Sequence, residues 1–139
     1  MTVAFERHPY SKLNSRQQEA YNFQKVSALL ADYGFITIRL TSDWRGADFI
    51  AQHVDGITFL KIQLKGRPTF EKKYQDRDLY ICFPHAGSWY VYPHDAVLTQ
   101  VLAAGMLQGT DSWDGKGGYS FPKLTKRLKA LLDPYRLEP

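Results

Sequence analysis

The chain has 139 residues, a formal net charge of +4 at pH 7 and an apolar content of 44%. This length suits a single domain over residues 1–139, large enough to bury about two-thirds of its unfolded surface. No apolar run approaches the ~18 residues of a membrane span, and the N-terminus lacks the apolar core of a signal peptide. The single cysteine, Cys82, excludes an internal disulfide, so a reducing cytoplasm is the expected compartment.

A long helix is predicted over residues 14–33, because this stretch contains no proline and no glycine. Ser15 and Gln18 have the spacing of a capping box. Apolar side chains recur at helical spacing and form a stripe for the core: Phe23, Val26, Leu29, Leu30 and Tyr33. Glu19 lies one turn before this stripe, where it is either a functional carboxylate or a solvated residue stabilised by the helix macrodipole.

A strand is expected at Phe35–Leu40, and a β-hairpin follows around Asp55-Gly56, one of the strongest short hairpin signals. If these two residues form the loop, residues whose numbers sum to 111 face each other, so Asp48 faces Gln63. Directly opposed side chains share a face, with Cβ atoms roughly 4.5–5.5 Å apart. Lys65 lies two residues further along on the same face. The sequence therefore predicts a carboxylate–amide–ammonium cluster.

The second strand of this hairpin supports the same register. Apolar and polar residues alternate along it from Leu60 to Lys65. A slip of one residue would bury two lysines and a glutamine and expose three aliphatic side chains. On the partner strand, Ile50 shares the face of Asp48, which indicates a strand buried on both sides.

The rest of the chain is predicted as a mixture of strands, helices and loops. In order, these are a polar loop over 66–77, strands at 79–83 and 88–92, a helix from Pro93 to about Ala104, a flexible surface loop over 108–118, and a last helix over 121–132 capped by Ser120. The histidines have no metal-ligand spacing and are expected at the surface or in turns: His8, His53, His85 and His94. Cys82 lies in an apolar strand and is expected to be a buried, inert thiol.

Two segments resemble the motifs of one nuclease superfamily. Residues 45–51, Arg-Gly-Ala-Asp-Phe-Ile-Ala, look like the first acidic motif of the PD-(D/E)xK, or restriction-endonuclease-like, superfamily. Residues 62–67, Ile-Gln-Leu-Lys-Gly-Arg, look like its second motif, in the Gln-x-Lys variant of some resolvase-like and restriction-type members. The resemblance covers roughly residues 14–92. It implies an α/β fold with a restriction-endonuclease-like core, a mixed β-sheet flanked by helices.

The resemblance also implies a metal-dependent endonuclease that cleaves DNA phosphodiester bonds, with Mg²⁺ as the cofactor and Mn²⁺ as a substitute. Asp48 would be the principal metal ligand, with Gln63, the carbonyl of Leu64 and Glu19 from the helix as further ligands. Lys65 would stand near the attacking water and the scissile phosphate. Gln63 occupies a position where many members have a carboxylate, and a glutamine offers Mg²⁺ an oxygen but no charge.

Basic residues cluster in and after the hairpin and are expected to bind backbone phosphates: Lys61, Arg67, Lys72 and Lys73. Arg67 is the expected phosphate clamp. A second basic cluster near the C-terminus, from Lys116 to Lys129, is interpreted as the solvated face of the last helix. The expected partner is DNA, duplex or branched, and no membrane is involved. A homodimer would allow both strands to be cut, although no interface can be read from the sequence.

Other interpretations of these residues stay open. Asp48 could cap a turn or pair with Arg45, and the polar face of Gln63 and Lys65 could simply be exposed. Trp44 could stack on a base or pack in the core. The chain could also be a catalytically weak or inactive nuclease-fold module for nucleic-acid binding or assembly, or a nuclease for structured RNA.

Overall fold

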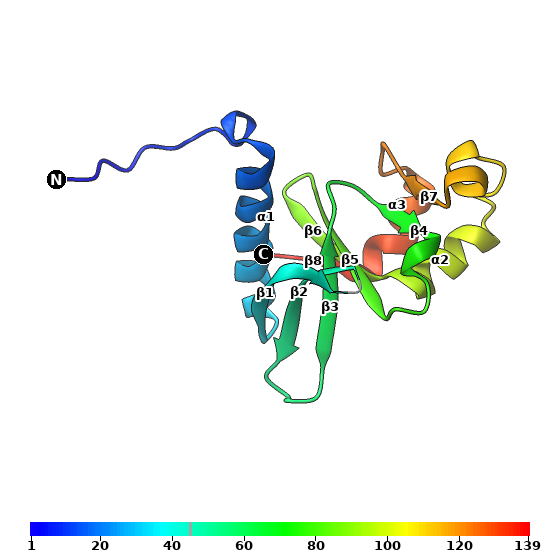
Figure 1. The fold of residues 1–139 in the computed structure, drawn as a ribbon, viewed down its shortest axis with the longest axis horizontal. Helices are drawn as coiled ribbons and strands as arrows, with labels where there is room; N and C mark the ends of the chain where they lie inside the picture. Colours follow the sequence, from blue (N-terminus) through cyan, green and yellow to red (C-terminus); the bar gives the residue numbers. More distant parts are fainter. Residues whose placement is uncertain (45) are drawn as a thin grey trace.

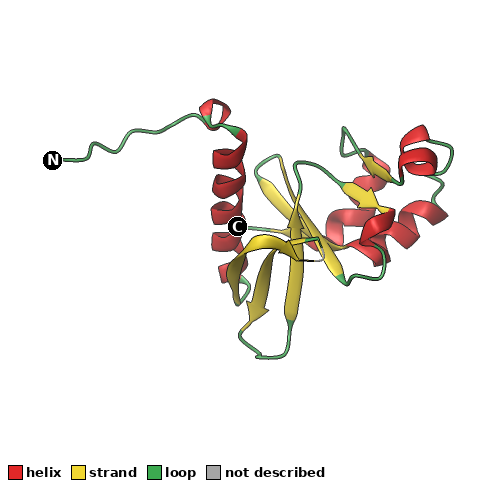
Figure 2. Ribbon diagram, viewed as in Figure 1, coloured by secondary structure: helices red, strands yellow, loops and turns green. Residues whose placement is uncertain are grey.

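The computed structural model describes residues 1–44 and 46–139, without the side chains of Asp43 and Trp44. The predicted roles of Arg45 and of the Trp44 ring therefore lie outside the described residues. A six-stranded mixed sheet has helix α1 (Ser15–Asp32) on one face, and α2 (His94–Ala103) and α3 (Lys126–Leu132) on the other (Figures 1 and 2). The predicted α/β fold, a mixed sheet flanked by helices, is confirmed.

The sheet has the strand order β1-β2-β3-β5-β6-β8, in which β3 and β5 are parallel and the other neighbours are antiparallel. Its strands are β1 (Phe35–Trp44), β2 (Ala47–His53), β3 (Phe59–Leu64), β5 (Leu79–His85), β6 (Ser88–Pro93) and β8 (Arg136–Leu137). A two-stranded sheet pairs β4 (Thr69–Glu71) with β7 (Gly118–Ser120). Short helical turns lie at η1 (Tyr10–Lys12), η2 (Lys72–Tyr74), η3 (Ser112–Lys116) and η4 (Asp133–Tyr135).

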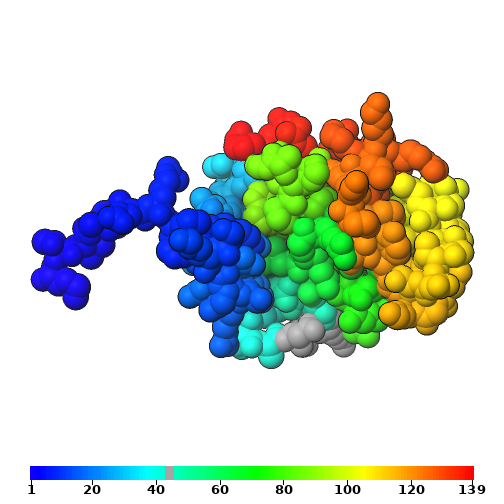
Figure 3. All heavy atoms as spheres, turned by 90° about the horizontal axis from the view of Figure 1, so that it is seen from above, coloured from blue at the N-terminus to red at the C-terminus, as the bar shows by residue number. Residues whose placement is uncertain are grey.

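The N-cap of helix α1 lies one residue before Ser15, the capping residue expected from the sequence. Asn14 is the N-cap: its side chain accepts the Gln17 amide, and the Gln17 side chain accepts the Asn14 amide, both at 2.9 Å. Val26 and Leu30 are buried against the sheet, whereas Tyr33 at the C-cap is exposed. Residues 1–9 precede η1 as an extended arm that projects from the body of the protein (Figure 3).

The predicted hairpin register is confirmed, but the predicted loop is wrong. Phe49 pairs with Ile62 and Gln52 with Phe59, so the partner numbers sum to 111. The strands stop earlier than expected, and the His53 amide donates to the Thr58 carbonyl at 2.9 Å. The Asp55 carboxylate accepts the Thr58 amide and hydroxyl, and these hydrogen bonds lower its pKa to about 2. The loop is thus longer by one residue on each side, which preserves the register.

Two segments predicted as loops are parts of the core. Within residues 66–77, Phe70 and Tyr74 are buried, and the Phe70 ring packs against Tyr92. Within 108–118, Trp113 is only 6% exposed and belongs to the same core cluster. Each segment is mostly polar, but one or two aromatic side chains anchor it in the core. Because so few apolar residues are involved, they produce no hydrophobic periodicity in the sequence.

The C-terminal part also differs from the prediction. Thr125, not Ser120, caps the last helix by accepting the Leu128 amide, and the helix is correspondingly shorter. Ser120 lies in β7, with its hydroxyl 2.9 Å from that of Thr69. His94 is fully buried rather than at the surface or in a turn. In the described residues no helix combines the length and apolar character needed to cross a membrane.

Candidate functional site

The first motif residue, Asp48, is tied directly to the second motif. Its Oδ2 accepts a hydrogen bond of 2.8 Å from the Leu64 backbone amide. The last ladder pair between β2 and β3 is Phe49 with Ile62, so Asp48 and Gln63 come next on the two strands. The start of β2 and the end of β3 therefore meet where the cluster was predicted.

A hollow of about 420 Å³ lies between the N-terminal half of α1 and this junction; we call it the Gln63 hollow. Among the residues that line it are Glu19, Asp48, Gln63, Leu64 and Lys65. The structure thus brings together all of the residues predicted to act as catalytic groups or metal ligands, including Glu19 from the helix.

The side chain of Gln63 is unusual within this hollow. Its Oε1 is buried and has no hydrogen-bond partner among the described residues. A buried carbonyl oxygen without a partner is costly, and ordered water or a cation would offset that cost. The hollow offers this oxygen, the carboxylates of Asp48 and Glu19 and the backbone of Leu64, a set of hard oxygen donors that suits Mg²⁺. Among the described residues, no three His, Cys, Asp or Glu side chains cluster as metal ligands.

Glu19 reaches the hollow from α1 but is engaged by an arginine. Its Oε1 lies 3.4 Å from a guanidinium nitrogen of Arg39 on β1, and both side chains are about half exposed. The Arg39 guanidinium also lies over the Phe23 ring, 5.5 Å from its centroid. An exposed ion pair of this kind contributes little to stability, so Glu19 can exchange partners at low cost.

A second hollow, of about 620 Å³, adjoins the first and shares Glu19 and Asp48 with it; we call it the Arg39 hollow. Arg16 and Arg39 also line it. Neither arginine was among the site residues predicted from the sequence. The only local signal was the position of Arg16, three residues before Glu19 on the same face of α1. With Lys65, three cations thus surround two carboxylates, an arrangement suited to a polyanion near bound metal.

Lys65 follows directly after β3. Its backbone amide donates to the Cys82 carbonyl at 2.8 Å, which continues the pairing between β3 and β5. Its Nζ lies over the Tyr74 ring, 5.6 Å from the centroid. The sheet therefore fixes the backbone from which this side chain extends, and the aromatic ring attracts its ammonium group.

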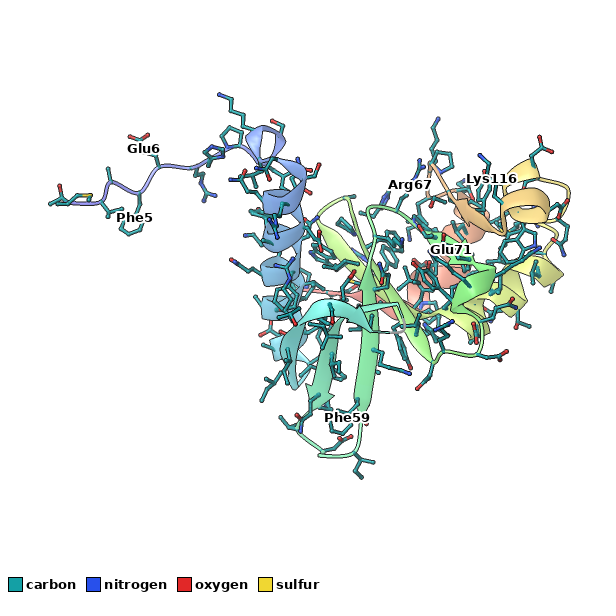
Figure 4. The ribbon with its side chains drawn as sticks, in the orientation of Figure 1. Phe5, Glu6, Phe59, Arg67, Glu71 and Lys116 are labelled. Atoms are coloured by element: carbon teal, nitrogen blue, oxygen red, sulfur yellow. The ribbon has the colours of Figure 1, made fainter. Side chains whose placement is uncertain are left out.

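None of the four residues expected to bind phosphates lines either hollow around Asp48. Lys61 borders a different pocket, with Asp76 and Asp78. Arg67 lines a further pocket together with Lys116 (Figure 4).

The other two are occupied by contacts within the protein. The Nζ of Lys72 lies 5.1 Å from the centroid of the Trp113 ring. That of Lys73 lies 3.7 Å from Glu71 Oε2. The basic cluster of the sequence is thus dispersed in the fold, and the role of these four residues in binding nucleic acid stays a prediction.

Comparisons with known proteins show a distant structural likeness. No protein-family model matches the chain, and no curated protein matches its sequence. Among solved structures, the chain is similar to Hjc, a Holliday junction resolvase from the archaeal hyperthermophile Archaeoglobus fulgidus. The TM-score is 0.42 with 16% sequence identity, over 53% of this chain and 70% of that chain.

Proposed function

We propose that this chain is a metal-dependent endonuclease that cleaves phosphodiester bonds in DNA. The observation that carries the proposal is the Gln63 hollow, where two carboxylates, an unpartnered amide oxygen and a lysine converge. A bound Mg²⁺ or Mn²⁺ would supply Lewis-acid stabilisation of the phosphate and a more acidic water. Asp48, Glu19, the Oε1 of Gln63 and the carbonyl of Leu64 are the groups that would hold it.

The protein residues would position the substrate around this ion. Lys65 would stabilise the negative charge that develops on the scissile phosphate, because an ammonium group in a partly enclosed site acts more strongly than in water. Arg16 and Arg39, in the adjoining hollow, would hold flanking phosphates. When Arg39 turns to a phosphate, it would release Glu19 for the metal.

The proposal is tested by cleavage of supercoiled plasmid and of a branched DNA in Mg²⁺, in Mn²⁺ and in EDTA. Wild type and Asp48→Asn are compared, with Asp32→Asn as a matched control because Asp32 is an exposed carboxylate at the end of α1, outside both hollows. We expect metal-dependent nicking by wild type and by the control only. The side-chain oxygen of the new asparagine can still accept the Leu64 amide, so loss of fold would not explain loss of cleavage. Cleavage that persists in EDTA or in Asp48→Asn would contradict the proposal.

A second candidate is a nuclease-fold module that binds nucleic acid without cutting it. Two observations favour it: Gln63 supplies no charge, and Glu19 is paired with Arg39. This candidate predicts DNA binding that is unaffected by EDTA and no nicking under any metal condition. Competition between duplex, branched and structured-RNA substrates would separate a DNA nuclease from an RNA nuclease.

A further inference from the structure

A third pocket, of about 500 Å³, lies where β4 pairs with β7 and shares no lining residue with the two hollows around Asp48. We call it the Arg67 pocket. The connection from β3 to β4, strand β4, the turn η3, and β7 with the residue Pro122 beyond it contribute to it. Its polar and aromatic lining consists of Arg67, Glu71, Ser112, Lys116, Tyr119 and Ser120. Figure 4 shows Arg67, Glu71 and Lys116 gathered in the part of the protein opposite α1.

The charges of this pocket suit a single phosphate group. Arg67 and Lys116 are exposed cations, and neither forms an ion pair with a carboxylate among the described residues. Glu71 is the one carboxylate in the lining, and its charge is already paired with Lys73, whose Nζ lies 3.7 Å from Oε2. Arg67 and Lys116 are therefore the two cations left to hold the negative charge of a nucleotide phosphate.

Glu71 adds a hydrogen-bond acceptor that a simple phosphate site would not contain. Its Oε2 is buried without a hydrogen-bond partner among the described residues, 3.7 Å from Lys73 Nζ. The Glu71 side chain packs beside Gly118, the ladder partner of Glu71. A Cβ added at Gly118 would lie 3.0 Å from Glu71 Cγ. The glycine thus makes room for this side chain. A carboxylate so placed favours a ligand that brings N–H donors.

Tyr119 supplies a flat surface in the same lining. The ring is half-buried and held edge-on by Phe121, with centroids 4.8 Å apart. A fixed aromatic ring beside cations is the usual platform for stacking an unpaired base. Cations, acceptor and ring together match the phosphate, the amino group and the face of one nucleotide.

We infer that the Arg67 pocket binds one unpaired nucleotide, with its phosphate on Arg67 and Lys116 and its base against Tyr119. The exocyclic amino group of cytosine, adenine or guanine would donate to Glu71, and thymine, which offers only its ring N3–H, would be disfavoured. The inference extends the proposed function, because Gly66 lines the Gln63 hollow and Arg67 is the next residue.

The test is binding of labelled single-stranded oligo-dC and oligo-dT of equal length, measured by fluorescence anisotropy in EDTA. We expect wild type to bind oligo-dC about fivefold more tightly, and Glu71→Gln to lose that preference because an amide can also donate to thymine. Arg67→Ala and Lys116→Ala should each weaken both complexes and lower the salt slope by about 0.7. Lys123→Ala is the matched control, since Lys123 is exposed and lies outside the pocket.

Two results would overturn the inference: arginine and lysine variants that bind no more weakly than Lys123→Ala, or an unchanged preference in Glu71→Gln. Free dCMP that competes as strongly as the oligonucleotide would overturn the assignment to a strand. Because binding is measured in EDTA, the outcome is independent of cleavage. If plasmid nicking requires Asp48 but the pocket variants bind normally, the nucleotide pocket is overturned and the proposed endonuclease function stands. If binding depends on the pocket but no nicking occurs, the endonuclease function is overturned and the nucleotide pocket stands.

Discussion

The Asp48 carboxylate accepts a hydrogen bond from the Leu64 backbone amide at 2.8 Å, across the junction of β2 and β3. This bond fixes the acid of the first motif against the strand that carries the second, so Gln63 and Lys65 are held beside it in one hollow. The same bond occupies one carboxylate oxygen with a neutral donor. On the proposed function, metal affinity at this site would therefore depend strongly on what the neighbouring side chain contributes.

Replacing Gln63 by glutamate is expected to tighten Mg²⁺ binding. The new carboxylate would put a negative charge at the place of the buried, unpartnered Oε1, and we expect about tenfold higher affinity, equal to about 1.4 kcal/mol. The measurement is the rise in melting temperature across a Mg²⁺ titration, which needs no cleavage. Gln24→Glu is the control, because Gln24 is exposed on α1. An equal Mg²⁺ response in the two variants would show that Gln63 does not face the ion.

Removing the ammonium group of Lys65 is expected to stop turnover while DNA binding in EDTA stays nearly unchanged. A single electrostatic group of this kind typically contributes about 10²–10³ in rate. The rate of plasmid nicking and the affinity for DNA are measured for Lys65→Ala and for Lys61→Ala. Lys61 lies four residues earlier along the same stretch of chain but borders a different pocket. If both variants lose the same fraction of activity, the effect is one of general charge and not of position.

The hairpin and its cluster were predictable because a strand has a period of two, which fixes both the register and the face of every residue. The two-residue loop was wrong, but a loop with one more residue on each side keeps that register. The contact between Glu19 and Arg39 was not predictable. It joins a helix to a strand whose relative position depends on packing of the whole core.

The two segments predicted as loops, residues 66–77 and 108–118, were wrongly predicted for the same physical reason. Trp113 and Phe70 are isolated apolar residues in polar stretches, and an isolated residue produces no period. Their burial follows from the pairing of β4 with β7, which joins segments far apart in the chain. The dispersal of the basic cluster has the same origin, because η2 directs Lys72 towards Trp113 instead of towards Asp48.

Truncating Trp113 is therefore expected to destabilise the whole domain. A buried tryptophan replaced by alanine typically costs about 3–5 kcal/mol, whereas a residue in a flexible loop costs almost nothing. The free energy of unfolding in urea is compared for wild type, Trp113→Ala and Ile57→Ala, because the Ile57 side chain is largely exposed. If Trp113→Ala lowers the free energy of unfolding by less than about 0.5 kcal/mol, residues 108–118 are a surface loop and not part of the core.

His94 gives a prediction about pH. Its ring is fully buried: Nε2 accepts the Glu71 amide at 3.1 Å, and Nδ1 lies 2.8 Å from Asp95 Oδ1. Because Nε2 is an acceptor, the ring is neutral and Nδ1 donates to Asp95. Burial lowers the pKa of His94 below its ordinary value of 6.5, although Asp95 and Glu71 act in the opposite direction.

The sign of the effect follows from proton uptake. As pH falls below 6.5, the unfolded chain binds a proton at this histidine before the folded protein does, so stability decreases until the lower folded pKa is reached. Above 6.5 this contribution is constant. The slope from one such group is at most about 1.4 kcal/mol per pH unit.

In His94→Gln the amide oxygen can still accept the Glu71 amide, but nothing titrates there, so the slope should disappear. Urea unfolding between about pH 8 and pH 5.5 measures it, with His8→Gln on the exposed arm as the control. Parallel pH profiles for wild type and His94→Gln would mean that the buried ring does not stay neutral in the folded protein.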